Sequence, residues 1–226
     1  MTEKPVFKEA QYSYMQDHVE KHGISRLGMM RNQDWHDDPR RFAFTFSRYK
    51  FAAKMLAGKS SVVEIGCGDA FASRLVQQTV GSFTAVDFDP IFIDDIKNRM
   101  NPEWPLQCFV HDILDGPVPG EFDGALSLDV LEHVDPRLEH KFLENTAASL
   151  TKHGVFVVGM PSLESQAYAS PQSKEGHVNC KSGDDFLILM QRYFHNVFLF
   201  SMNDEALHTG FYPMAHYLIA VCCDKK

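Results

Sequence analysis

Residues 61–70 read SVVEIGCGDA, an apolar run that ends in two glycines. The β-branched residues of its first half favour a buried strand, and Gly66 and Gly68 favour a tight turn directly after that strand. In open α/β sheets, ligands bind beyond the carboxyl ends of the strands, where a glycine turn lets the backbone approach them closely. A single G-x-G pattern is weak evidence, so the rest of the chain has to decide the fold.

The chain continues as an alternation of apolar runs and amphipathic segments. Strands are expected at 61–66, 83–89, 106–113, 122–129 and 154–161, and helices at 70–80, 90–100 and 136–150. Repeated strand–helix units with continuously apolar strands predict an α/β fold, with a doubly wound parallel sheet covered on both faces. Two further strand-like runs, 196–203 and 216–223, have no long helix between them and are expected to pair antiparallel at one edge.

Two regions flank this alternation. Residues 1–59 are expected to form a helical N-terminal extension that covers the substrate, and residues 60–226 to form the main domain. The irregular segment 162–185 is too long for an idle connection, and such loops often bind ligands. Together, the extension and this loop are expected to form the pocket for the substrate. Its candidate aromatic residues are Trp35, Phe42, Phe46 and Tyr168, and its candidate cations are Arg40 and Arg41.

The bulk composition excludes several classes of protein. The 226 residues carry a formal net charge of −8, which disfavours a protein that grips nucleic acid through phosphate contacts. The five cysteines show no ligand-like spacing, so a reducing compartment is expected, with no disulfide framework or zinc knuckle. The N-terminus shows no apolar signal core, and no apolar run approaches the length of a membrane span. These features favour the cytoplasm and leave the oligomeric state open.

Acidic residues follow the next two strands. Asp87 ends the second strand, where such folds place the acid that binds ribose hydroxyls. Asp112 and Ile113 follow the third strand, where they offer a carboxylate to an exocyclic amine and an apolar side chain to a base. A dinucleotide fingerprint would place Gly where this chain has Phe71, and Asp69 would repel a pyrophosphate. The pattern therefore favours a nucleoside site over a dinucleotide site.

Four segments in this order, VVEIGCGDA, AVDFDP, HDI and FDGALSLDVLEHV, resemble the class I S-adenosylmethionine-dependent methyltransferases over roughly residues 60–160. The resemblance implies a Rossmann-like seven-stranded sheet in the order 3-2-1-4-5-7-6, with the last strand antiparallel, and S-adenosylmethionine as cofactor. It places Arg48 at the methionine carboxylate, Asp87 at the ribose, and Asp112 with Ile113 at the adenine. The complete set of expected cofactor-binding residues is Arg48, Glu64, Gly66, Cys67, Gly68, Asp87, Phe88, Asp112, Ile113 and Asp129.

The segment DVLEH supplies the candidate catalytic residues Asp129, Glu132 and His133. One turn of helix would place all three on one side. With His177 in the long loop, the set resembles the metal site of the small-RNA 2′-O-methyltransferases and of the ubiquinone-pathway O-methyltransferases, although both usually have Glu where this chain has Asp129. The resemblance implies a divalent Mg, Mn, Fe or Zn ion held by these four residues. Without a metal, His133 is the candidate general base.

The predicted function is methyl transfer from S-adenosylmethionine to a hydroxyl on a sugar or another small diol. A nicotinamide-dependent oxidoreductase on the same sheet is one alternative, which Phe71 and Asp69 disfavour. A non-catalytic S-adenosylmethionine-binding module is another, which the acid and histidine set disfavours because a pure binder has no use for it. The expected partner is thus a small-molecule or sugar acceptor, and neither a nucleic acid nor a membrane.

Overall fold

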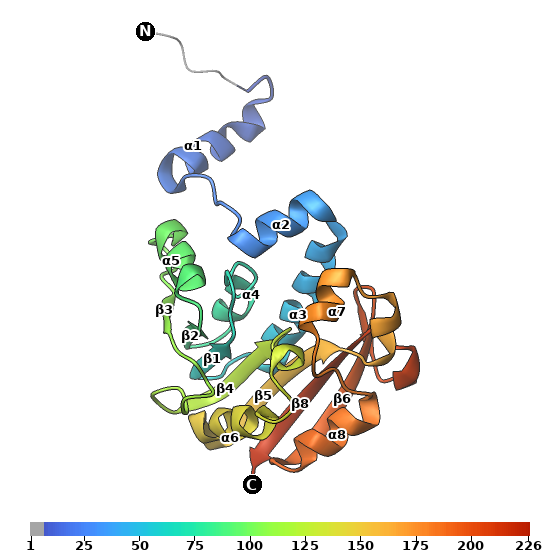
Figure 1. The fold of residues 1–226 in the computed structure, drawn as a ribbon. Coiled ribbons are helices and arrows are strands. Elements are labelled where there is room, and N and C mark those ends of the chain that lie inside the picture. Colours follow the sequence, from blue (N-terminus) through green and yellow to red (C-terminus); the bar gives the residue numbers. More distant parts are fainter. Residues whose placement is uncertain (1–6) are drawn as a thin grey trace.

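The computed structural model describes residues 7–226, a central sheet with helices on both faces (Figure 1). The start of the predicted N-terminal extension, before residue 7, lies outside the described residues. The helices and strands in chain order are α1 (Ser13–His22), α2 (Met29–Asp37), α3 (Arg40–Met55), β1 (Ser61–Ile65), α4 (Arg74–Gln77), β2 (Ser82–Asp87), α5 (Pro90–Arg99), β3 (Gln107–Val110), β4 (Phe122–Leu128), α6 (Glu139–Ser149), β5 (Leu150–Pro161), α7 (Pro171–Gly176), α8 (Gly183–Gln191), β6 (Phe194–Asn203), β7 (Ala206–His208) and β8 (Tyr217–Lys225). The short 3-10 turn η2 (Leu131–His133) follows β4, and η3 (Glu164–Tyr168) follows β5.

Within residues 7–226 the sheet has eight strands in the order β3-β2-β1-β4-β5-β8-β6-β7. β1 to β5 pair in parallel, and β8 lies antiparallel between β5 and β6. The predicted doubly wound fold and its strand order are therefore confirmed, including the antiparallel final strand. The predicted number of strands was wrong, because the short β7 pairs with β6 and adds an eighth strand at the edge.

Alternate residues of the central strands face opposite sides of the sheet and build two cores. In β1, Val63 and Ile65 belong to the core that α6 and α8 cover, whereas Val62 belongs to the core that α3, α4 and α5 cover. All three side chains are at most 2% exposed. The continuous apolar run in the sequence thus reflects burial on both faces of a parallel sheet.

The helix expected over residues 70–80 is much shorter than predicted, because only Arg74–Gln77 are α-helical. Ala70 adopts a left-handed φ of 48°, which an α-helix does not accommodate, so the helix begins only after this turn. Ser73 lies between Ala70 and the start of the helix and faces the interior, where its hydroxyl donates to the carboxylate of Glu64. The residues expected to form the first turn of this helix therefore belong to the glycine turn and to the buried hydrogen bond with Glu64.

The N-terminal helices differ in how they meet the sheet. Neither α1 nor α2 contains a buried residue, whereas α3 places Tyr49, Ala52 and Ala53 in the core. In Figure 1, α1 lies farthest from the sheet and α2 lies between α1 and the body of the domain. In the described part of the chain, no helix has both the length and the apolar composition that a bilayer crossing requires.

Candidate active site

The turn after β1 depends on two glycines and one acid of β2. Gly66 and Gly68 adopt left-handed φ values of 72° and 51°, which glycine tolerates best. A Cβ on Gly66 would lie 2.5 Å from a methyl carbon of Val130, and one on Gly68 would lie 2.5 Å from the sulfur of Met30. The N–H of Gly68 donates to Oδ2 of Asp87 at 2.8 Å. Conformation and close packing therefore both require glycine here, and Asp87 is fixed against the turn.

A cavity of about 380 Å³ opens beside this turn; we call it the cofactor cavity. Its volume falls within the range of small-molecule and cofactor sites. Six of the predicted cofactor-binding residues line it, namely Gly66, Cys67, Gly68, Asp87, Phe88 and Asp129. The predicted catalytic His133 also lines it, so the structure brings the glycine turn, the acid of β2 and the end of β4 to one cavity.

Four predicted cofactor residues do not line this cavity. Asp112 accepts a hydrogen bond from the N–H of Leu114 at 2.8 Å and so closes the turn after β3, and Ile113 is packed in the core. Glu64 lies behind the glycine turn, and Arg48 lines a different cavity. The structure thus places these four residues around the cavity without exposing them to it.

Glu64 is a buried carboxylate with two hydroxyl partners. It is 1% exposed, and it accepts hydrogen bonds from Tyr49 Oη at 2.5 Å and from Ser73 Oγ. Burial raises the pKa of Glu64 to about 7, although the two hydrogen bonds act in the opposite direction. Because Tyr49 belongs to α3 and Ser73 follows the glycine turn, Glu64 ties the N-terminal helices to the base of the cofactor cavity.

The N-terminal helices supply a wall of the cofactor cavity that the sequence analysis missed. Met30 and Arg31 of α2 line it together with Thr45 and Tyr49 of α3. Arg31 is the single Arg or Lys among its lining residues. Its backbone N–H donates to Oδ2 of Asp69 at 2.8 Å, and its guanidinium donates to Thr45 Oγ1 at 2.5 Å. No local pattern connects α2 with the glycine turn, so only the folded packing identifies this wall.

Asp129 does not share a helical turn with Glu132 and His133, contrary to the sequence-based expectation. It ends β4 with a left-handed φ of 59°, and the turn η2 begins only at Leu131. Arg48 Nη1 donates to both carboxylate oxygens of Asp129, at 2.9 and 2.8 Å. Its guanidinium carbon also lies 3.6 Å from the centre of the Tyr217 ring. The reversal of the backbone at Asp129 thus directs its carboxylate to Arg48.

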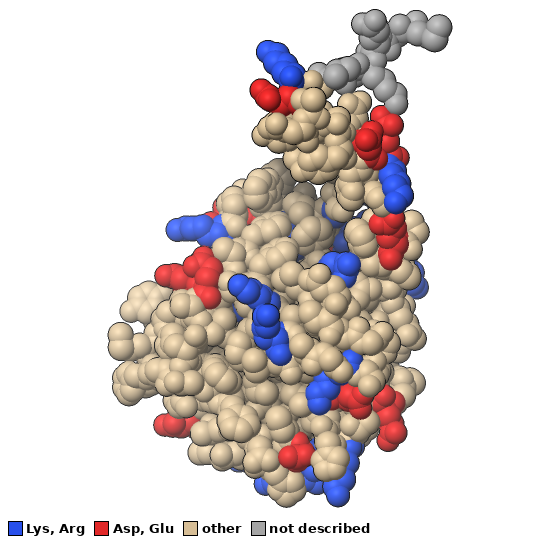
Figure 2. Space-filling view, turned by 180° about the vertical axis from the view of Figure 1, so that it is seen from behind, with Lys and Arg blue, Asp and Glu red and all other residues tan. Residues whose placement is uncertain are grey.

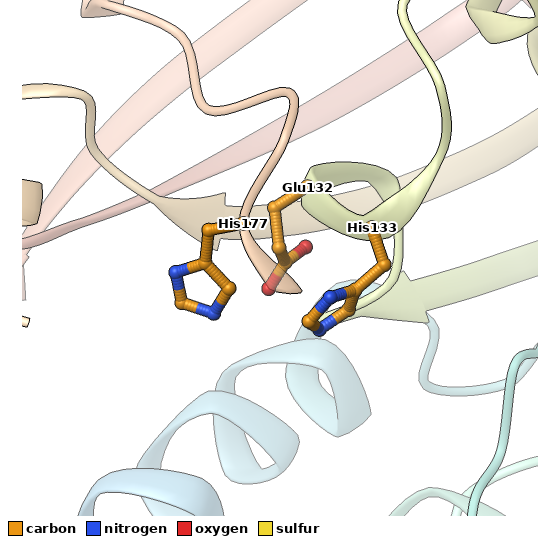
Figure 3. A group of neighbouring side chains, drawn as sticks. All are labelled: Glu132, His133 and His177. Carbon is orange, nitrogen blue, oxygen red and sulfur yellow. The ribbon is translucent and has the colours of Figure 1, made fainter. Parts of the chain in front are cut away.

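Glu132, His133 and His177 form a compact group of potential metal ligands. One ligand atom from each of the three lies within 4.8 Å of the others, and Asp129 is not part of this group. The carboxylate of Glu132 lies between the two imidazole rings (Figure 3). Both of its oxygens are buried without a hydrogen-bond partner. Burial and the nearby charge of Asp129 raise the pKa of Glu132, although the charge of Arg48 acts in the opposite direction.

Hydrogen bonds orient both imidazoles of this group. Nδ1 of His133 lies 2.9 Å from the carbonyl oxygen of Gly176, and Nδ1 of His177 lies 2.8 Å from Oε1 of Gln166. Because carbonyl and amide oxygens accept hydrogen bonds, each Nδ1 carries the proton and each Nε2 keeps a free lone pair. Burial also lowers the pKa of His177, which favours its neutral form. Such outer hydrogen bonds are characteristic of histidines that bind metals.

A second cavity, of about 450 Å³, lies on the other side of these residues; we call it the acceptor cavity. Arg48 and His177 line it, whereas their neighbours Asp129 and His133 line the cofactor cavity. The ion pair and the histidine pair therefore form the wall between the two cavities.

The predicted acceptor-binding residues separate in the structure. Tyr168 and Arg41 line the acceptor cavity. Arg40 forms an exposed ion pair with Asp38 at 2.8 Å. The predicted aromatic residues of the N-terminal extension instead stack in a row with Phe71, in the order Trp35, Phe42, Phe46 and Phe71. Packing between α2, α3 and the glycine turn thus accounts for these aromatic side chains.

Comparison with known proteins supports the fold. Residues 62–154 match a family model described as a methyltransferase domain. The search of curated proteins gave no match. Among solved structures, the N-methyltransferase NodS from Bradyrhizobium japonicum WM9, in complex with S-adenosylhomocysteine, is 17% identical, with a TM-score of 0.59, and the match covers 83% of this chain and 89% of NodS.

Two further structures are similar. The methyltransferase domain of bacterial CtHen1-C is 14% identical with a TM-score of 0.66, and the match covers 80% of this chain and 98% of that domain. The TehB-like S-adenosylmethionine-dependent methyltransferase from Corynebacterium glutamicum is 19% identical with a TM-score of 0.61, and the match covers 95% and 99% of the two chains. At these identities the similarity establishes the fold.

Residues 62–154 match a methyltransferase domain, and the chain as a whole has the Rossmann-like fold of the class I methyltransferases.

Proposed function

We propose that this protein is an S-adenosylmethionine-dependent methyltransferase that transfers the methyl group to a hydroxyl of a sugar or another small diol, with the help of a divalent metal ion. One observation carries this proposal. A buried carboxylate without any hydrogen-bond partner, Glu132, lies between two imidazoles with free Nε2 lone pairs, in the wall between the two cavities. Buried unpaired polar groups are destabilising, so a group of this kind at a cavity wall favours a ligand that completes it.

The cofactor cavity suits S-adenosylmethionine in its distribution of charge. Asp87 would bind the ribose hydroxyls at the carboxyl end of β2. Three acids and a single arginine line the cavity, and they complement the sulfonium and ammonium charges and the carboxylate of the cofactor. We assign the carboxylate to Arg31 in place of Arg48, because Arg31 lines the cofactor cavity whereas Arg48 lines the acceptor cavity. Both arginines are ion-paired, Arg31 with Asp34 at 3.0 Å and Arg48 with Asp129 at 2.8 Å, so their location decides the assignment.

The residues of the wall fit a divalent ion. Glu132, His133 and His177 supply one carboxylate and two neutral imidazole nitrogens. This donor set suits Mn²⁺, Fe²⁺ or Zn²⁺ better than Mg²⁺, which prefers oxygen ligands. A bound metal would lower the pKa of a hydroxyl on the acceptor. Asp129, expected among the ligands, is assigned instead to the ion pair with Arg48.

The chain itself performs the remaining steps. Donor and acceptor in adjoining cavities would have to meet through an opening in the shared wall, and the reaction would then take place between pre-positioned groups. His133 lines the cofactor cavity close to this wall and could accept the proton of the hydroxyl if no metal is bound. Exposed Tyr168 and half-exposed Arg41 at the acceptor cavity are suited to hold the rest of a polar acceptor.

A turnover screen with a chelator tests the proposal. Purified protein is incubated with S-adenosylmethionine and panels of sugars, nucleotide sugars, catechols and amines, and release of S-adenosylhomocysteine is measured. We expect turnover with vicinal diols, its loss in EDTA, and its recovery with one of Mn²⁺, Fe²⁺ or Zn²⁺. Turnover of diols that is unaffected by EDTA would contradict the role of the metal and leave His133 as the base. Turnover of amines alone would contradict O-methylation.

A further inference from the structure

A third cavity, of about 250 Å³, lies between the N-terminal extension and the helices α4 and α5; we call it the arginine cavity. Arg26 lines it from the segment before α2, Arg74 from α4, and Arg99 from the end of α5. Trp104 and Phe71 form apolar walls. The proposed methyl transfer uses none of the three arginines or Trp104.

The charge of this cavity contrasts with that of the whole protein. No Asp or Glu is among its lining residues, although the chain carries a net charge of −8. On the face seen in Figure 2, basic and acidic side chains are scattered, with no large patch of one sign. Three arginines among the residues that line one small cavity, with no acid among them, are therefore a local feature of the protein.

Two of the three arginines have no carboxylate partner within the described residues. Arg99 is paired with Asp95 at 2.9 Å. Arg26 donates only to the carbonyl oxygen of Asn98, at 3.0 Å, and Arg74 contacts the ring of Trp104. Both charges are thus free to bind an anion, and guanidinium groups bind phosphates through two parallel N–H donors.

Arg74 is held in position. Its guanidinium carbon lies 4.7 Å from the centre of the Trp104 ring, a cation–π contact. Gln77, one turn later in α4, donates to the carbonyl oxygen of Pro105 at 3.0 Å and so ties the segment of Trp104 to the helix. A pre-positioned guanidinium loses less conformational entropy when it binds a ligand than a freely rotating one does.

The arginine cavity shares a wall with the cofactor cavity. Ala70 and Phe71 line both of them. Arg99 donates to the carbonyl oxygen of Asp69, in the glycine turn itself. A ligand bound by these arginines would therefore lie against one side of the glycine turn, whose other side faces the cofactor cavity.

We infer that the arginine cavity binds a small phosphorylated compound with a flat apolar part, such as a nucleoside monophosphate. Arg26 and Arg74 bind its phosphate, and Phe71 and Trp104 contact its ring. Because Ala70 and Phe71 are shared, occupancy of this site changes the affinity for the cofactor, and by linkage the cofactor changes the affinity for the phosphorylated compound equally. Binding at this site does not depend on the proposed acceptor chemistry; only its effect on the cofactor rests on the cofactor cavity.

Trp104 offers a direct readout, because the chain has only two tryptophans. In a Trp35→Phe variant, Trp104 is the single tryptophan, and excitation at wavelengths where tyrosine does not absorb reports on it alone. The variant is saturated with S-adenosylhomocysteine to fill the cofactor cavity and is then titrated with AMP, inorganic phosphate or adenosine. We expect a saturable change in Trp104 emission with AMP, a weaker effect with phosphate, and none with adenosine. An unchanged emission with AMP, or an equal effect of adenosine, would overturn the proposal.

Charge-removing variants locate the binding. Arg74→Gln and, separately, the exposed Arg26→Gln are expected to weaken AMP binding about tenfold each. Arg192→Gln, an arginine outside this cavity, should leave it unchanged. Calorimetry with S-adenosylhomocysteine, with and without AMP, measures the coupling. Equal AMP affinity in all three variants would contradict the site. If the parent protein does not bind S-adenosylhomocysteine, the cofactor assignment is wrong. The Trp104 titration in the absence of S-adenosylhomocysteine still tests the arginine cavity in that case.

Discussion

The cofactor cavity and the acceptor cavity differ in how completely the chain satisfies their buried polar groups. In the cofactor cavity, Asp87 and Asp69 each accept hydrogen bonds from two backbone N–H groups. At the acceptor cavity and its wall, both oxygens of Glu132, Oε2 of Glu164 and Nε of Arg48 are buried without a partner. The chain itself therefore supplies hydrogen-bond partners for these acids of the cofactor cavity, whereas several buried polar groups at the acceptor cavity have no hydrogen-bond partner.

This difference separates two kinds of site. A buried donor or acceptor without a partner destabilises a fold by about 1–3 kcal/mol, more if it is charged. Several such groups around one cavity indicate that a ligand supplies the missing contacts. The cofactor cavity, by contrast, is pre-organised to accept its ligand with little rearrangement. Variants on the acceptor side should therefore affect turnover, and variants on the cofactor side should affect cofactor affinity.

The largest effect is expected from Glu132→Gln. Glutamine keeps the size of the side chain but removes the charge that would bind a divalent ion, so turnover should fall by about 100-fold or more. Rescue by Mn²⁺, Fe²⁺ or Zn²⁺ should be lost as well. The affinity for S-adenosylhomocysteine should stay within about twofold, since Glu132 does not line the cofactor cavity.

Steady-state turnover at several metal concentrations, together with calorimetry of S-adenosylhomocysteine, checks this prediction. Glu175→Gln, at an exposed acid of α7, is the control and should behave as the parent protein. His177→Ala should reproduce the loss. A Glu132→Gln variant with full turnover would show that the unpaired carboxylate is not functional. A parallel loss of cofactor affinity would break the separation between the two cavities.

A smaller and more selective effect is expected from Arg31→Ala. If Arg31 binds the carboxylate of the cofactor, its loss should weaken S-adenosylhomocysteine by roughly 10–100-fold, as expected for a hydrogen bond between charged groups. Binding of 5′-methylthioadenosine, which lacks the amino-acid part, should be unchanged. Arg48→Gln is the matched comparison, since Arg48 lies on the acceptor side, and should leave the ratio of the two affinities as it is. An unchanged ratio in Arg31→Ala, or a changed one in Arg48→Gln, would reverse the assignment of the two arginines.

The same contrast explains how far the sequence could predict the protein. The strand order and the glycine turn were predictable because they depend on local signals, namely apolar runs, glycines and acids at strand ends. The extra strand β7 was not predictable, because it has only three residues and becomes a strand only by pairing with β6. The pairing of Arg48 with Asp129 depends on the left-handed backbone at Asp129, for which aspartate gives no firm signal.

The candidate site follows the same rule. Glu132 and His133 are adjacent in the sequence and were predicted together, and His177 was added through a resemblance. Arg31 was missed, because α2 reaches the glycine turn only through the packing of the N-terminal helices. What could not be predicted is therefore the set of contacts between segments that are distant in the sequence.

The smallest effect concerns Glu64, the buried acid behind the cofactor cavity. Its pKa is raised to about 7 in the folded protein, mainly by burial, whereas the ordinary value is 4.5. Between these two pH values the folded protein retains a proton that the unfolded chain has lost. The contribution of Glu64 to the free energy of unfolding is therefore fully present below about pH 4.5, falls as the pH rises towards 7, and is constant above that.

Glu64→Gln should remove this dependence, because glutamine mimics the protonated acid and still accepts a hydrogen bond from Tyr49 or Ser73. Urea unfolding of the variant and of the parent protein at pH 5, 6, 7 and 8 measures the difference between them. We expect the variant to gain stability relative to the parent as the pH rises to 7, by a few kcal/mol at most. Glu121→Gln, at an exposed position, should show no such trend. If the difference in unfolding free energy between variant and parent is constant across this range, Glu64 remains ionised in the folded protein. Its two hydroxyl partners would then fully stabilise a buried charge on the cofactor side.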